Sequence, residues 1–210
     1  MNQVVGLNED QRDCLQEIVN VAMGQAGDSL ARFLEVFINL SVPRIRLVSS
    51  AELPDTLSEM VGGVERISAV RQGFYDSVNA HGMRGEAIIV FSDNSFKELA
   101  DLLAYEDELN DASEKELLLD VTNVLTGACL NGIAEQIETE LAYSAPSILG
   151  MHHKIPDLLS PDKVPWGQAL LVEVNYTLEN RSFSCNLLFL MPGEAIERVK
   201  AALDKLLEDF

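Results

Sequence analysis

The chain carries one pattern twice: residues 13–24 read DCLQEIVNVAMG, and residues 116–127 read ELLLDVTNVLTG. Both copies place two acidic residues and an asparagine at steps of four and three: Asp13, Glu17 and Asn20, then Glu116, Asp120 and Asn123. At about 100° per residue, these steps put the polar side chains on one stripe of an α-helix. Apolar residues occupy the opposite face. The pattern predicts two long amphipathic helices in equivalent positions.

The repeat extends beyond these helices. Pro43 follows Asn20, and Pro146 follows Asn123, with 22 residues between amide and proline in both copies. Further on, at an offset near 100, residues 87–91 correspond to 186–190. A period this long indicates duplication of one structural unit rather than a solenoid. We expect a single domain, 1–210, built from two pseudo-symmetric repeats at about 8–104 and 111–208.

Each repeat reads as a long helix, several strands and a shorter helix. The long helices are expected at 8–38 and 111–142, capped by Asn8 and Ser113, and the shorter ones at 94–104 and 193–208. Alternating apolar and polar residues predict strands at 43–48, 65–79, 83–91, 146–153, 167–178 and 181–191. Three prolines predict a loop at 154–166. The fold class is α+β, with long helices packed on a mostly antiparallel sheet.

Composition narrows the function. The 210 residues are 47% apolar and carry a net charge of −19, which argues against binding to nucleic acid or to an anionic membrane and favours a basic or metal-bearing protein partner. No apolar run reaches the roughly 20 residues of a membrane span, and the N-terminus lacks the regions of a signal peptide. Cys14, Cys129 and Cys185 are too scattered for a disulfide framework. A cytoplasmic protein is expected.

The polar stripes need an explanation beyond solubility. A single exposed acid on a helix is usually solvated surface, but here the whole stripe is duplicated. Asn is disfavoured inside a helix by roughly 0.5 kcal/mol relative to Ala, and Gly by about 1 kcal/mol. Gly24 and Gly127 nevertheless lie one turn beyond each asparagine, on the same stripe. Glycine there leaves room for another molecule to approach, so each helix is predicted to present a docking surface.

Other candidate sites are weak. His152 and His153 would point to opposite faces of a strand, so they are poorly placed to share a metal ion. His81 falls in an expected hairpin turn. We find neither a phosphate-binding Gly-rich loop of the Walker type nor a nucleophile elbow.

The pattern of acid, three residues, acid, two residues, Asn and 22 residues to Pro resembles that of the CheC, CheX and FliY phosphatases of bacterial chemotaxis. The resemblance spans nearly the whole chain, and two motif copies point to the CheC type. The first copy fits at every position. In the second, Glu116 stands where the family has Asp or Ser, and Asp120 stands where it has Glu.

The resemblance implies hydrolysis of the aspartyl phosphate on a phosphorylated CheY-like response regulator. By analogy, Glu17 and Asp120 would engage the regulator's phosphate-contacting Lys, and Asn20 and Asn123 would orient the attacking water. Residues that would help the regulator dock are Asp13, Gly24, Glu116 and Gly127. The chain needs no cofactor of its own in this scheme, because the regulator supplies Mg²⁺.

Two other functions remain open at this point. The middle domain of the flagellar switch protein FliM is similar in fold but lacks the acid and amide motif, so this chain could be a non-catalytic interaction module. An adaptor for a CheD-like deamidase is the third reading. The two intact amides favour the phosphatase.

Overall fold

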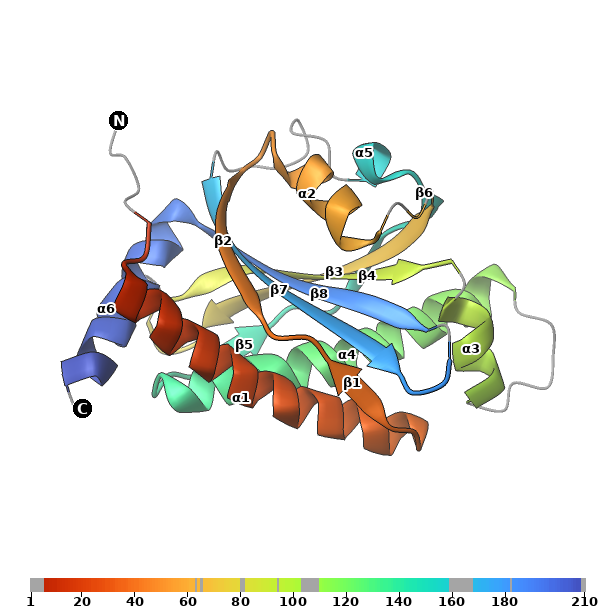
Figure 1. Ribbon diagram of the computed structural model, residues 1–210, viewed down its shortest axis with the longest axis horizontal. Coiled ribbons are helices and arrows are strands. Elements are labelled where there is room, and N and C mark those ends of the chain that lie inside the picture. The colour runs from red at the N-terminus through yellow and green to blue at the C-terminus, as the bar shows by residue number, and fades with distance from the viewer. Residues whose placement is uncertain are drawn as a thin grey trace.

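The computed structural model describes residues 6–62, 64, 66–79, 82–93, 95–102, 110–158, 168–181 and 183–208. Figure 1 shows a twisted sheet with two long helices on one face and two short helices on the other. The helices are α1 (Glu9–Leu34), α2 (Leu53–Met60), α3 (Ser95–Leu102), α4 (Asp111–Gln136), α5 (Ile155–Leu158) and α6 (Gly193–Glu208). The strands are β1 (Ile38–Leu40), β2 (Arg44–Ser49), β3 (Ile67–Asp76), β4 (Arg84–Ser92), β5 (Leu141–Tyr143), β6 (Ser147–His153), β7 (Gln168–Leu178) and β8 (Ser184–Pro192).

The sheet has the order β1-β7-β8-β4-β3-β5, and every pairing among the described strands is antiparallel. β2 continues β1 along β7, and β6 continues β5 along β3. At the centre, Ile88 of β4 pairs with Leu188 of β8, which differs by one residue from the offset of 99 that relates 87–91 to 186–190 in the sequence. A pseudo-twofold axis therefore passes through the sheet close to this pair. The predicted α+β class and pseudo-symmetric halves are confirmed.

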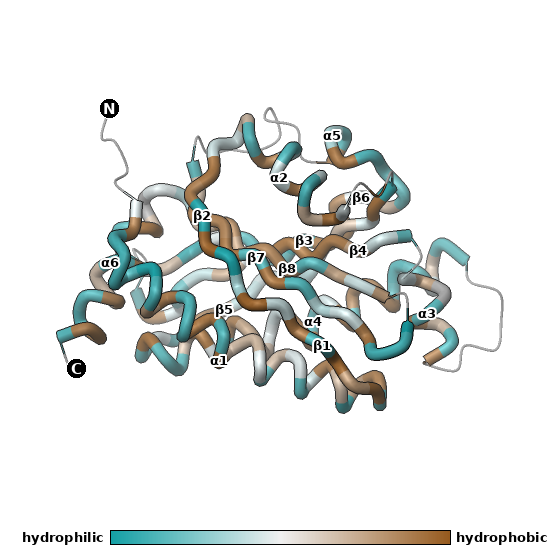
Figure 2. The backbone as a smooth tube through the Cα atoms, in the orientation of Figure 1, coloured by the Kyte–Doolittle hydropathy of each residue, from teal (hydrophilic) through white to brown (hydrophobic). Residues whose placement is uncertain are grey.

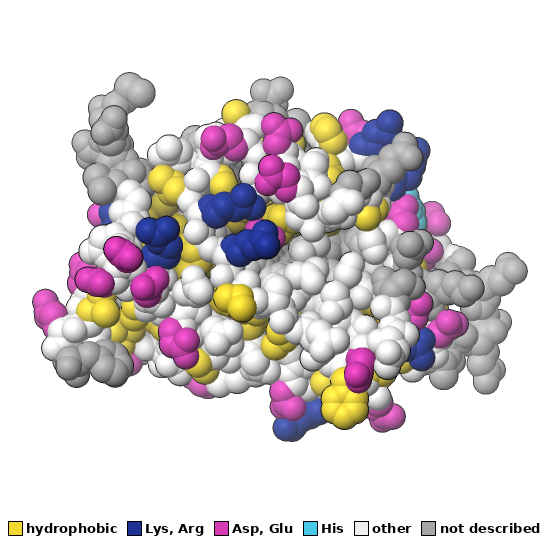
Figure 3. All heavy atoms as spheres, in the orientation of Figure 1, with side chains coloured by type: hydrophobic (Ala, Val, Ile, Leu, Met, Phe, Trp, Pro, Cys, Tyr) yellow, Lys and Arg dark blue, Asp and Glu magenta, His cyan; other side chains and the backbone are white. Residues whose placement is uncertain are grey.

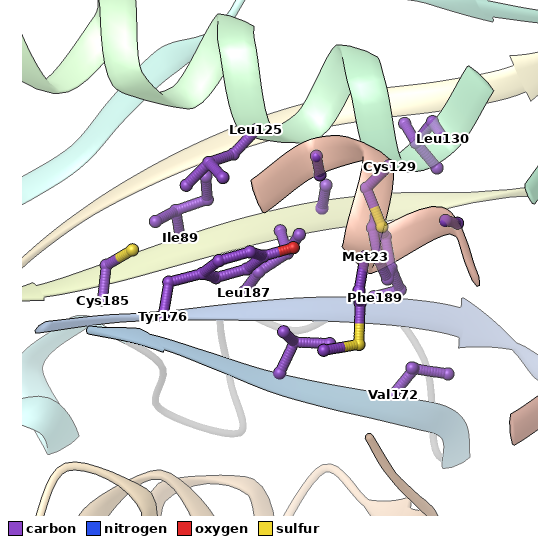
Figure 4. Close-up of a cluster of buried hydrophobic side chains, with 14 of the residues drawn as sticks. Met23, Ile89, Leu125, Cys129, Leu130, Val172, Tyr176, Cys185, Leu187 and Phe189 are labelled. Carbon is purple, nitrogen blue, oxygen red and sulfur yellow. The ribbon is translucent and has the colours of Figure 1, made fainter. Parts of the chain in front are cut away.

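The central strands are apolar on both faces because both faces are covered. Successive side chains alternate between faces, so Ile89 and Phe91 join the main core beneath α1 and α4, while Ile88 and Val90 join a second cluster beneath α2 and α5. Figure 2 shows brown segments along the central strands, and teal segments on the solvent side of the long helices. Figure 4 shows part of the main core. The apolar side chains on each face of the sheet pack against the helices that cover that face.

The two long helices run antiparallel and in close contact. A Cβ atom on Gly132 would lie 2.8 Å from the Cα atom of Ala22, and nearer the helix ends Glu17 shares a groove with Gln136. From the first of these contacts to the second, the residue number decreases in α1 and increases in α4, so the two helices are antiparallel. The C-terminal end of α4 therefore lies beside the third turn of α1, which contains Glu17.

Both long helices end earlier than predicted. α1 stops at Leu34 rather than residue 38, and α4 stops at Gln136 rather than residue 142. Glu35 and Glu138 adopt left-handed backbone conformations, with φ of 54° and 52°. This turn away from the helix sends the chain into β1 and β5, short edge strands that the sequence analysis did not predict. The proline positions fit: Pro43 and Pro146 immediately precede β2 and β6.

Two local predictions are wrong. The N-cap of α4 is Asn110, whose side chain accepts hydrogen bonds from the Ala112 and Ser113 backbone amides, and Ser113 is the third helical residue. Residues 155–158 of the expected loop form α5, because Ile155 and Leu158 are buried in the cluster beneath α2. The helix-capping role of Asn8 is confirmed. The α2 helix was not anticipated.

Several predicted features fall partly outside the described residues. The loop beyond residue 158, the helix beyond residue 102 and His81 are among them. The strands at 43–48, 83–91, 146–153 and 167–178 agree to within one or two residues with the observed ones, whereas β3 and β8 are shorter than predicted.

By length and composition, α4 could cross a membrane, and it is the one described helix that meets that criterion. In the fold, 61% of its most apolar stretch is buried. Its core-facing side packs on the sheet, and its outer side carries Glu116 and Asp120. These features are typical of a core helix, which passes the same test.

Candidate functional site

The first polar stripe lies on the outer surface of α1. Asp13, Glu17 and Asn20 are exposed, whereas Leu15 and Val19 on the same turns are buried in the main core. Helical spacing dictates this division, since the apolar positions face the sheet. None of the three polar side chains makes a hydrogen bond or ion pair with any described residue. The fold therefore leaves both acids and the amide available to another molecule.

The second stripe has the same arrangement on α4. Glu116, Asp120 and Asn123 are exposed, and none of them is bonded to a described residue. A Cβ atom on Gly24 or on Gly127 would meet no atom of a described residue within 4 Å. Packing against the described part of the chain therefore does not require glycine at either position. Gly24 is exposed and Gly127 half-buried, so the first stripe is the more open of the two.

Other amides on these helices have structural roles. Gln11 caps α1 and also donates to Asp204 on α6 at 2.7 Å, and Asn131 accepts a hydrogen bond from the Tyr143 hydroxyl. The amides of Asn20 and Asn123 have no such use. An amide offers one acceptor oxygen and two N–H donors, so each of these side chains can both position a water and contact an anionic oxygen.

The antiparallel packing separates the two stripes. Asn20 lies near the C-terminal end of α4, because its neighbours Glu17 and Ala22 lie beside Gln136 and Gly132. Asn123 lies about three turns away, roughly 16 Å along the helix axis at 1.5 Å per residue. The chain thus presents two separate acid and amide surfaces at opposite ends of one helix pair.

A groove with a volume of about 440 Å³ runs beside the first stripe. Its lining comes from three helices: Asp10, Asp13, Cys14, Glu17, Ile18 and Val21 of α1, Gln136 of α4, and Leu206 and Leu207 of α6. A hydrogen bond from Gln11 to Asp204 and an ion pair of 2.8 Å between Lys205 and Glu138 hold the end of α6 in place. This groove could not be predicted from the sequence, because helical periodicity does not reveal which helix end crosses another.

The structure also builds a polar cluster around His152. The Nδ1 atom lies 3.1 Å from Asp93 Oδ1, and the Nε2 atom lies 3.0 Å from Glu114 Oε2. The imidazole ring packs on Phe96 with centroids 5.3 Å apart. Burial lowers the pKa of His152, but the hydrogen bond with Glu114 and the charge of Asp93 raise it more, so the net direction is upward. The cluster is an ion-pair network joining β6, the β4–α3 turn and the start of α4.

Metal and thiol chemistry have no prepared site in the described residues. No three His, Cys, Asp or Glu side chains among them are arranged to hold a metal ion. All three cysteines are free. Burial raises the pKa of the Cys129 thiol to about 12, and burial also raises the pKa values of Cys14 and Cys185, so the thiols stay protonated at neutral pH.

No protein-family model and no curated protein matches the sequence. Solved structures do match. The crystal structure of Thermotoga maritima FliY aligns with a TM-score of 0.71 at 17% identity, covering 96% of this chain and 99% of that one. The FliM middle domain from H. pylori aligns at 0.62 and 10%, covering 93% and 99%. The chemotaxis protein CheX from Desulfovibrio desulfuricans aligns at 0.55 and 12%, covering 83% and 99%.

At these identities the likeness concerns the backbone. It spans nearly all of the FliY, FliM and CheX chains, so the whole arrangement of sheet and helices is shared and not one motif. This chain has the fold of the chemotaxis and flagellar-switch proteins FliY, CheX and FliM.

Proposed function

We propose that this chain is a phosphatase that hydrolyses the aspartyl phosphate of a CheY-like response regulator. The observation that carries the proposal is the pair of exposed acid and amide stripes, which the fold duplicates and which make no hydrogen bond or ion pair with the described residues. The fold shared with FliY and CheX supports the same function. In this scheme the partner is the phosphorylated regulator, which also supplies Mg²⁺.

The chemistry asks little of the protein beyond positioning. Water attacks the phosphorus atom in line as the bond to the regulator's aspartate oxygen breaks, which yields inorganic phosphate and a free carboxylate. Holding that water in line and stabilising the charge are the main contributions in phosphoryl transfer. The carbonyl oxygen of Asn20 would accept a hydrogen bond from the water, and its NH₂ group would donate to a phosphoryl oxygen. Asn123 would act in the same way on α4.

The acids have a different role in the proposal. A carboxylate beside a phosphoryl group is repelled unless it meets a cation, so Glu17 and Asp120 would pair with the Lys that contacts the phosphate in the regulator. Asp13 and Glu116 lie one turn earlier on the same stripes. Gly24 and Gly127 leave the opposite ends of the stripes free of side-chain bulk.

The test is phosphate release from a phosphorylated CheY-like regulator. Wild-type protein should accelerate release, and the double variant Asn20→Ala, Asn123→Ala should lose about a hundredfold or more of that acceleration. Its melting temperature should be unchanged or slightly higher, because Ala is the better helix former. Asp55→Ala, an exposed change on α2 at the opposite face of the sheet, is the matched control and should retain full activity. A fully active double variant would make both amides dispensable.

The FliM-like fold favours one competing function, a non-catalytic interaction module. Such a module would bind the regulator without accelerating phosphate release, so binding and release measured together distinguish the two. An adaptor for a CheD-like deamidase would bind that enzyme whether or not the amides were intact. The double variant separates this third function from catalysis.

A further inference from the structure

The groove beside the first stripe combines an aliphatic lining with an acidic rim. Ile18, Leu206 and Leu207 contribute to the lining, and Val21 and Leu207 leave 40% and 36% of their surface exposed to water. Asp10, Asp13 and Glu17 supply three carboxylates, and no Lys, Arg or His is among the described residues that line the groove. A partner that fits this surface needs an apolar side chain for the groove and cations for its rim.

We infer that the groove docks a surface segment of the response regulator in which an apolar side chain stands next to Lys or Arg. The inference rests on the proposed function, since it names the contact surface used at the first of the two sites. Complementary charge steers encounter and fixes register, while burial of exposed Val21 and Leu207 against the partner removes apolar surface from water.

A second copy of this chain is a poorer occupant. The chain carries a net charge of −19, so two acidic surfaces would repel each other. Figure 3 shows several basic side chains on the face of the molecule that carries β2. The basic residues of β2 itself are Arg44 and Arg46. Both are already engaged with Glu173, at 4.0 and 3.1 Å. They are therefore less available to neutralise the groove of a neighbouring molecule.

The groove adjoins the residues proposed to act on phosphate. Glu17 belongs to the groove and to the stripe, and Val21 directly follows Asn20 on α1. A segment of the regulator bound in the groove would hold the regulator against α1, and the groove residues of α6 would determine the position of the contact. Docking would then select among regulators by the segment they present, whereas the acid and amide contact a part of the regulator that all of them share.

The test compares two substitutions that each replace an exposed apolar residue by lysine. Leu207→Lys places a cation in the groove, and Val42→Lys makes the same change between β1 and β2, where Val42 is 68% exposed and outside the groove. Two quantities are measured for each variant: the dissociation constant for the regulator carrying a stable acyl-phosphate mimic, and the kinetics of phosphate release. Leu207→Lys should raise the dissociation constant and the half-saturating concentration about tenfold with an unchanged maximal rate. Val42→Lys should change neither.

The outcomes separate the groove from the function. If wild-type protein releases phosphate and the two lysine variants behave alike, the groove proposal is wrong and the phosphatase stands. If wild-type protein binds without releasing phosphate and only Leu207→Lys weakens binding, the groove stands and the phosphatase falls. A regulator that does not bind the wild type overturns both. Retention of full affinity in Leu207→Met, which keeps an apolar side chain, is also required.

Discussion

Glu17 and Asp120 occupy equivalent positions, but they differ in length by one methylene. The Asp120 carboxylate reaches roughly 1.5 Å less far from its helix, given ordinary carbon bond lengths. Misplacement on the order of 1 Å in a positioning site can cost about a hundredfold in rate. The exposed position of Gly24, against the half-buried Gly127, also favours approach to the first stripe. We therefore propose that the first site carries most of the activity.

Single amide variants test this difference. Asn20→Ala should remove most of the phosphate-release activity, Asn123→Ala should remove little, and Asp120→Glu should be neutral or activating. The measurement is the rate of phosphate release at saturating and at limiting regulator. Greater damage from Asn123→Ala would reverse the assignment and make the second stripe the working site.

Two glycines on the long helices differ in what surrounds them, so replacing each by alanine should have opposite effects on stability. Gly132 lies where α4 touches α1, and a Cβ there would come within 2.8 Å of the Ala22 backbone. Gly24 faces open space on the outer side of α1. Gly132→Ala should therefore lower the free energy of unfolding by about 1–3 kcal/mol through overpacking, while Gly24→Ala should raise it by up to about 1 kcal/mol through helix propensity.

Urea unfolding of the two variants measures both effects. If Gly24 is kept for docking, as proposed, Gly24→Ala should also weaken binding of the regulator although it stabilises the fold. A Gly24→Ala variant that is both more stable and unchanged in binding would leave its glycine without a functional explanation.

The helices and strands show which features of the fold can be predicted from a single sequence. Asp13, Glu17 and Asn20 could be placed on one exposed stripe because helical periodicity is local, and the duplication indicated two pseudo-symmetric halves. The strands β1 and β5 are only three residues long, too short for a pattern, and they form because β7 and β3 offer pairing edges. The groove and the His152 cluster depend on segments far apart in the sequence, such as Asp93, Glu114 and His152, so periodicity could not predict them.

The ionic cluster at His152 makes the stability of the whole chain depend on pH. The folded-state pKa of His152 is raised above its ordinary value of 6.5. The stabilisation is therefore fully present below about pH 6.5 and is lost as the pH rises through the higher, folded-state pKa. His152→Asn removes the ionisable ring while tolerating the left-handed backbone at this position, where φ is 55°.

Urea midpoints of wild type and His152→Asn should differ more at about pH 6 than at about pH 8.5, a range that brackets the ordinary histidine pKa. Wild type and His152→Asn share all their other titratable groups. Subtracting one urea midpoint from the other therefore cancels the contribution of those groups. His153→Asn, next to it and exposed, is the control and should show no such dependence. A difference that grew with pH would contradict the ion-pair assignment.

The pairing of β4 with β8 at the pseudo-twofold axis has a consequence for synthesis. Ile88 must wait for Leu188, 100 residues later in the chain. At about 5–20 residues per second on the ribosome, this wait lasts roughly 5–20 s. During it, β4 is an open strand edge with apolar residues on both faces, the kind of template that pairs with other chains. Because β8 is the counterpart of β4, the β4 strand of a neighbouring nascent chain resembles the β8 strand that is still missing. Pairing of β4 strands between two chains therefore competes with completion of the fold.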